Sequence, residues 1–69
     1  MSLNIRLINQ GHVHQFVVTR AVDGWEVREE EDAAVLKQVL RVDWHRVETD
    51  ALLFRVTERV LKGEGWVDG

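Results

Sequence analysis

Alternating apolar and polar residues predict strands in the first half of the chain. The alternation covers residues 3–8, 12–22 and 25–31, and the first two stretches are rich in Val, Ile, Leu and Phe. Asn9-Gln10-Gly11 separates the first two stretches, and Asp23-Gly24 separates the second from the third. Asp-Gly suits a two-residue type I′ turn, in which both central residues have positive φ. The pattern therefore predicts an antiparallel meander.

The register of the first hairpin follows from burial. If Gln10-Gly11 is a two-residue turn, Ile5 lies opposite Phe16 and Leu3 lies opposite Val18. The apolar side chains of both strands then share one face. A slip of one residue would move the apolar residues of the first strand to the other face, so this register is favoured.

The second hairpin extends the same apolar face. Pairing Val22 with Trp25 across the Asp23-Gly24 turn adds Trp25 and Val27 to it. The same register also places Arg20 on this face. Its guanidinium then has to extend past the sheet to reach solvent.

Residues 33–42 fit two different structures. A helix after an Asp32 cap would align Val35, Leu36, Val39 and Leu40. A strand would instead align Leu36, Leu40, Val42 and Trp44. The β-branched residues and the ease of continuing the meander favour a fourth strand over 35–42, after a turn near 31–34.

A C-terminal helix is predicted over residues 44–62, where helix-forming residues dominate. Basic residues lie late in this segment, which suits the helix dipole. Gly63 and Gly65 predict its end, and Trp66 is expected to fold back on the last turn. The predicted fold is therefore a single α+β domain over residues 1–69, with one helix packed on an antiparallel three- or four-stranded meander.

The predicted helix carries more apolar surface than one sheet needs. At about 100° per residue its apolar side chains span more than half of the circumference, whereas an arc somewhat over 100° suffices for one buried side. We expect Leu53, Val56 and Val60 to cover the sheet, and Phe54 and Leu61 to form an interface. A curved sheet and two wrapping tails would bury both flanks instead. The favoured interpretation is a homodimer or a protein partner.

Composition narrows the functional classes. The chain has 69 residues, no Cys, and nine Lys or Arg against twelve Asp or Glu. Without cysteine there is no disulfide to maintain, so a cytoplasmic location is expected. The net charge of −3 disfavours nucleic acid as a partner. No apolar run approaches the roughly 20 residues that span a bilayer, so no membrane partner is expected. The acidic run 29–32 is expected to be solvated.

His12 and His14 form the one pattern with metal-ligand chemistry. Residues two apart on a strand point the same way, so both imidazoles are candidates for one ion. Glu31 is a diagonal neighbour of His14 in the predicted register and is the candidate third ligand. Ordinary strand-end histidines are the favoured alternative, and no cofactor is expected.

Trp44, His45 and Arg46 are candidate contacts for an anion or a small ligand. They gather an aromatic ring, an imidazole and a guanidinium at the predicted helix start, where free backbone N–H groups also favour anions. The favoured alternative is structural, with Trp44 over a small core and Asp43 as the N-cap.

The chain contains no nucleophile elbow, no Gly-rich phosphate loop and no HExxH motif. An enzyme is therefore not expected. The leading hypothesis is a small non-enzymatic interaction or regulatory module that self-associates. The alternative is a small ligand- or metal-binding domain that uses His12, His14 and the turn 44–46.

Overall fold

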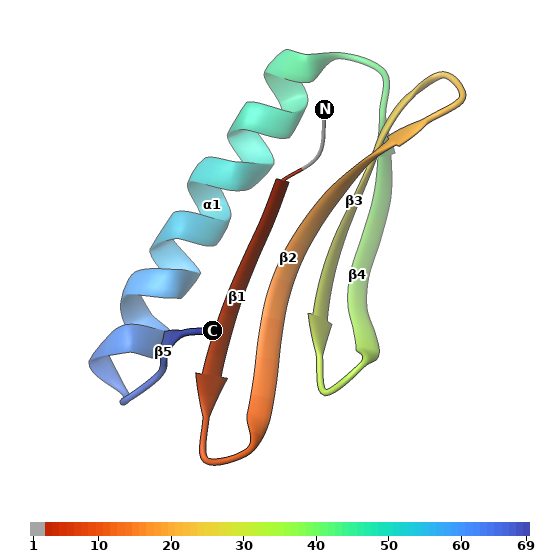
Figure 1. Cartoon of the computed structure of the whole chain (residues 1–69). Helices are drawn as coiled ribbons and strands as arrows, with labels where there is room; N and C mark the ends of the chain where they lie inside the picture. Colours follow the sequence, from red (N-terminus) through yellow and green to blue (C-terminus); the bar gives the residue numbers. More distant parts are fainter. Residues whose placement is uncertain (1–2) are drawn as a thin grey trace.

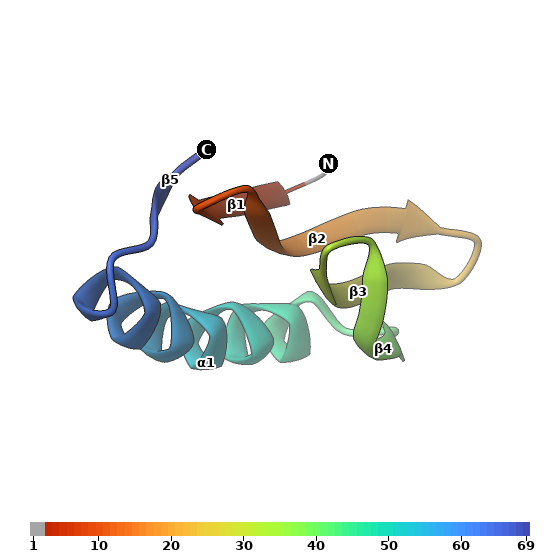
Figure 2. The same cartoon turned by 90° about the horizontal axis from the view of Figure 1, so that it is seen from below.

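A computed structural model describes residues 3–69 and confirms the α+β fold: an antiparallel sheet packed by one C-terminal helix (Figure 1). The helix lies along one face of the sheet, and the sheet curves around it (Figure 2). Strand order across the sheet is β4-β3-β2-β1-β5. In chain order the elements are β1 (Leu3–Asn9), β2 (His12–Ala21), β3 (Gly24–Glu31), β4 (Ala34–Arg41), α1 (Trp44–Gly63) and β5 (Val67–Asp68).

The first hairpin has the predicted register. Ile5 pairs with Phe16 and Leu3 pairs with Val18. The turn residues Gln10 and Gly11 have φ of 49° and 84°, as a type I′ turn requires. The alternation of β2 therefore buries Phe16 and Val18 against the helix.

The predicted register of the second hairpin is wrong by two residues. Arg20 pairs with Trp25 and Ala21 pairs with Gly24, so the turn consists of Val22 and Asp23. Gly24 is needed in β3 itself, because a Cβ there would overlap the carbonyl oxygen of Arg41. A shift of two residues keeps each side chain on its face.

Arg20 has a place in the observed register. Its guanidinium carbon lies 5.2 Å from the centroid of the Trp25 ring, within the range of a cation–π contact. The side chain is exposed, so the charge stays in water while the stem covers the ring.

Residues 34–41 form a strand, as the favoured interpretation of this segment predicted. The turn before β4 consists of Asp32 and Ala33, whose φ values are 51° and 69°. Positive φ is uncommon outside glycine, but Asp adopts it more readily than most residues. The carboxylate of Asp32 accepts from the backbone N–H of Val13 at 2.8 Å. A bulge follows, because Glu29 pairs with Lys37 but Glu30 pairs with Val35.

The helix has the predicted position and both of its ends are capped. Asp43 accepts from the backbone N–H of His45 at 2.9 Å. At the other end Gly65 has φ of 104°, and the N–H of Trp66 donates to the carbonyl of Leu61 at 3.1 Å, as in a Schellman motif. Trp66 thus folds back as expected, and it leads into β5, a short strand that the sequence did not predict.

The core lies between the sheet and α1. Its buried apolar members are Leu7, Phe16, Val18, Val27, Val47 and Phe54. Trp25 and Trp44 close one end with ring centroids 5.0 Å apart in an edge-to-face arrangement. Within residues 3–69 no helix is both long and apolar enough to cross a membrane.

Replacing Gly24 by Ala is expected to lower the free energy of unfolding by about 2 kcal/mol or more, because the new Cβ meets the backbone of β4 and φ is 146°. Gly63→Ala is the matched control, since a Cβ there meets nothing within 4 Å. In the helix it should be neutral or stabilising by up to about 1 kcal/mol. Urea unfolding of both variants tests this, and equal effects would contradict it.

Candidate functional site

The helix α1 carries apolar side chains on two sides. One row faces the sheet and consists of Trp44, Val47, Ala51, Phe54 and Leu61, all buried or half-buried. The other row consists of Leu52, Leu53, Val56 and Val60, whose side chains are 55–68% exposed. We call this second row the outer stripe. No strand of the described chain covers it, since each of the four residues is more than half exposed.

The two sides of α1 are the reverse of the expected arrangement. Phe54 was expected at an interface and is 3% exposed in the core. Leu61 is half-buried under the C-terminal turn, whereas Leu53, Val56 and Val60 do not cover the sheet. An interface on this helix therefore has to use the outer stripe.

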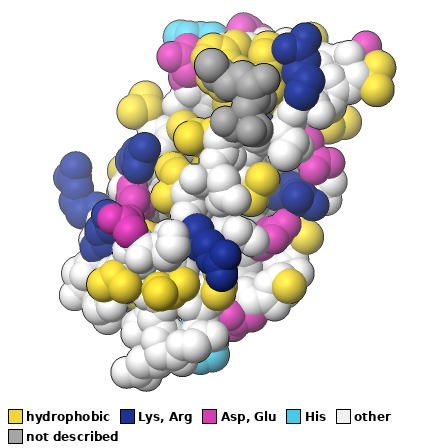
Figure 3. All heavy atoms as spheres, in the orientation of Figure 1, with side chains coloured by type: hydrophobic (Ala, Val, Ile, Leu, Met, Phe, Trp, Pro, Cys, Tyr) yellow, Lys and Arg dark blue, Asp and Glu magenta, His cyan; other side chains and the backbone are white. Residues whose placement is uncertain are grey.

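Glu58 makes the inner row hard to identify as the buried side of the helix from the sequence. It occupies an inner position one turn after Phe54 and is 8% exposed, so a charged residue interrupts the buried row. Arg55 reaches its carboxylate at 2.7 Å and Lys62 at 3.5 Å. These neighbours gather charge along one side of α1, visible in Figure 3. The pairing offsets the cost of placing a carboxylate beside the core.

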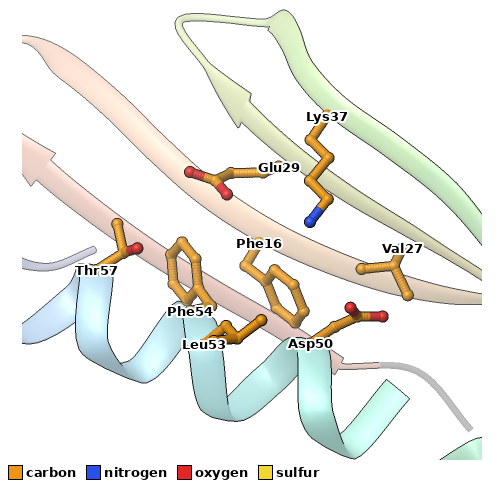
Figure 4. A pocket seen from close by; sticks show the side chains of 8 residues that line it. All are labelled: Phe16, Val27, Glu29, Lys37, Asp50, Leu53, Phe54 and Thr57. Atoms are coloured by element: carbon orange, nitrogen blue, oxygen red, sulfur yellow. The ribbon is translucent and has the colours of Figure 1, made fainter. Parts of the chain in front are cut away.

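A groove opens between α1 and the strands β3 and β4 (Figure 4). It encloses about 190 Å³. Its lining residues are Phe16, Val27, Glu29, Lys37, Asp50, Leu53, Phe54 and Thr57. Phe16 and Phe54 form its floor, with parallel rings whose centroids are 4.9 Å apart. Leu53 belongs to both the groove and the outer stripe, so the two form one continuous surface.

Asp50 joins α1 to β4 at the end of the groove that lies nearest the N-terminus of α1. It is 7% exposed and accepts two hydrogen bonds from Arg41, at 2.8 and 3.0 Å. The paired hydrogen bonds raise the pKa of Arg41, so the guanidinium stays charged. This contact ties the end of β4 to the second turn of α1.

His14 contacts Glu29, which is the other carboxylate that lines the groove. The imidazole is 5% exposed and stacks on Phe54, with centroids 5.9 Å apart. Its Nε2 lies 2.8 Å from Glu29 and its Nδ1 lies 3.3 Å from Glu31. A neutral imidazole donates from one nitrogen only, so donation to both carboxylates requires the doubly protonated ring. Because Glu29 and Asp50 already have basic partners, the groove offers mainly its apolar floor to another molecule.

The structure does not bring His12 to the same partners as His14. His14 and Glu31 meet, but the exposed His12 contacts Asp32 at 2.8 Å instead. Glu31 lies directly opposite His14 on β3, whereas the partner of His12 lies in the turn that follows β3. Between Leu3 and Gly69 no group of three or more His, Asp or Glu side chains is arranged to hold a metal ion.

The candidate ligand contacts at the helix start do not converge. Trp44 packs on Trp25, whereas His45 is 84% exposed and Arg46 is exposed. The carboxylate of Asp43 already accepts from the first turn of the helix, so a negative charge occupies the place that an anion would take.

No family model matches this chain, and no curated protein or solved structure matches it either. Its function has to be inferred from the residues and contacts of the chain itself.

Removing the buried carboxylate of Asp50 should open the groove and destabilise the domain. We expect Asp50→Ala to lower the free energy of unfolding by about 2–3 kcal/mol, because it leaves a partly buried guanidinium without its partner. Glu48→Ala is the control: this carboxylate is 60% exposed and 3.9 Å from His45, so the change should stay within about 0.5 kcal/mol. A loss for Asp50→Ala no larger than for the control would contradict the role assigned to Asp50.

The pair His12 and Asp32 should give a measurable pH dependence. The hydrogen bond to Asp32 raises the pKa of His12 above its ordinary 6.5, and hydrogen bonds from Val13 and His12 lower the pKa of Asp32 below 3.8. The His12 contribution to stability is therefore present below pH 6.5 and lost as pH rises through the raised pKa; the Asp32 contribution is lost as pH falls through the lowered one.

An NMR titration of the His12 ring measures this shift. Asp32→Asn should return its pKa towards 6.5. Asp23→Asn, an exposed carboxylate at another turn, should leave it unchanged. An identical His12 titration in wild type and Asp32→Asn would refute the assignment.

Proposed function

We propose that this chain is a small non-enzymatic interaction module that works as a symmetric homodimer joined through the outer stripe of α1. The observation that carries the proposal is the row of four large apolar side chains, each more than half exposed. Single exposed apolar residues are ordinary, but a contiguous row beside an apolar groove is typical of an interaction surface.

The energy of covering this row is sufficient to matter. Burying a Val or Leu side chain fully stabilises by about 1.5–3 kcal/mol, so covering the exposed part of four contributes roughly 4–7 kcal/mol before the cost of association. The groove adds little accessible apolar area, because Phe16 and Phe54 on its floor are each only 3% exposed.

Charges beside the outer stripe are compatible with a second copy in antiparallel orientation. By helical geometry one border carries Glu48 early and Arg59 late, and the other carries Arg46 early and Glu64 at the C-cap. An antiparallel pair of helices places each of these charges near an opposite charge of the partner. A parallel two-fold pair would bring the two different borders together and would place Glu48 near the partner's Arg46, so these charges are compatible with both orientations. Antiparallel helices are also what a two-fold axis perpendicular to them generates.

Val56→Glu, in the middle of the outer stripe, tests the proposal. Wild type should have the mass of a dimer in light scattering at micromolar concentration, and the variant should have the mass of a folded monomer with an unchanged circular dichroism spectrum. Val22→Glu is the control, because Val22 lies in a turn and is 98% exposed, and this variant should remain a dimer.

The two sides of the helix should also respond differently. Phe54→Glu places a charge in the core and should unfold the domain rather than dissociate it. A wild-type monomer throughout the micromolar range, or a Val56→Glu dimer as stable as wild type, would refute the proposed interface.

A further inference from the structure

The strand β4 is an open edge of the sheet (Figure 1). At the opposite edge β5 pairs with β1, whereas β4 pairs with β3 alone. Three apolar side chains of β4 are exposed, namely Val35, Leu36 and Leu40, at 49%, 56% and 71%. β4 contains no proline, but Lys37 and the bulge at Leu36 give it two of the features that commonly protect edge strands.

The outer stripe alone is too small for a stable interface. Stable protein interfaces bury about 800 Å² on each partner, which is about a sixth of the 4749 Å² surface of this chain. The four side chains of the stripe expose only roughly 250 Å² of apolar surface. A dimer that uses the stripe therefore needs a neighbouring surface, and β4 borders the same groove through Lys37.

We infer, building on the proposed homodimer, that two copies also pair through β4, antiparallel and with Gln38 on the two-fold axis. The two sheets then become one continuous sheet, and the open backbone N–H and C=O groups of each β4 are paired. The groove connects the stripe to β4, because Leu53 of the stripe and Lys37 of β4 both line it (Figure 4).

For both helices to lie on the same face of the joined sheet, the two-fold axis has to pass between two copies of the same β4 residue. Val39 packs against the core and Lys37 lines the groove, so these side chains lie on the helix side of the sheet. Directly opposed side chains of an antiparallel pair share a face. An axis through a residue therefore leaves both α1 helices on one face of the joined sheet, where their stripes can meet. An axis between two residues would separate the helices onto opposite faces.

Charge disfavours Lys37 and Val39 as axis residues, and Gln38 between them pairs more of β4 than Leu36 or Leu40 would. With Gln38 on the axis, Lys37 lies opposite the partner's Val39, and no two charges are opposed. An axis through Lys37 opposes two ammonium groups, and an axis through Val39 opposes Lys37 to the partner's Arg41. Like charges directly opposite one another destabilise a strand pair.

The same register matches the exposed leucines of β4. Leu36 lies opposite the partner's Leu40, and the pair occurs twice because of the symmetry. Leu36 is the extra residue of the bulge between Val35 and Lys37, and Leu40 lies in the regular part of β4. Cross-strand apolar pairs of this kind stabilise a sheet.

Single cysteines test the register, because the chain contains none. In Gln38→Cys the two introduced thiols lie directly opposite each other, with Cβ atoms about 4.5–5.5 Å apart, close to the separation in a disulfide. In Lys37→Cys the two are diagonal neighbours about 7–8 Å apart. Under copper-phenanthroline oxidation the disulfide-linked dimer of Gln38→Cys should form roughly tenfold faster, as followed by non-reducing gel electrophoresis.

Each result distinguishes this pairing from the proposed function. If Gln38→Cys is a dimer in light scattering but forms no disulfide, the β4 pairing is wrong and the stripe interface stands. If it cross-links no faster than Lys37→Cys, the register is wrong. If both variants and wild type are monomers, both proposals fail. A second test mixes Leu36→Cys with Leu40→Cys, and only the mixture should cross-link rapidly.

Discussion

The stacking of Phe54 on Phe16 determines how the helix lies on the sheet. With ring centroids 4.9 Å apart and both side chains 3% exposed, this contact fixes the rotation of α1 about its own axis. Every other property of the surface follows from that rotation. Asp50 is brought to Arg41, Glu29 and Lys37 face the groove, and the outer stripe is left without a covering strand.

Much of the fold could be predicted because it depends on local chemistry. Turn residues and alternation sufficed for the strands, and caps and glycines sufficed for the helix. The predicted register of β2 and β3 was wrong because Asp23-Gly24 resembles a type I′ turn. Gly24 is instead required by its close contact with the end of β4, which no local sequence pattern indicates. The strand β5 has two residues, which is too short for any periodic pattern to reveal.

The candidate site was less predictable because it depends on apolar residues that are exposed and on a charged residue that is buried. The unbroken outer row of leucines and valines resembles a buried face, while Glu58 interrupts the row that is buried. The aromatic residues Trp44 and Phe54, spaced for one side of the helix, were the available signal. The acidic run 29–32 was expected to be solvated, but Glu29 and Glu31 hold His14, and Asp32 holds both His12 and the turn before β4. The sequence of the acidic run does not distinguish solvated carboxylates from those that bind a side chain of the opposing strand.

The pairing of β5 with β1 makes the two edges of the sheet unequal. Val67 and Asp68 occupy the backbone groups of β1 at Ile8 and Leu7, and Gly69 donates to the carbonyl of Arg6. A sheet with two available edges can add copies at both ends and grow into a filament. Here the C-terminal residues occupy part of one edge, so strand addition at β4 has no equivalent site from which to continue. In the proposed pairing the two β4 edges cover each other, so that assembly would close at two chains.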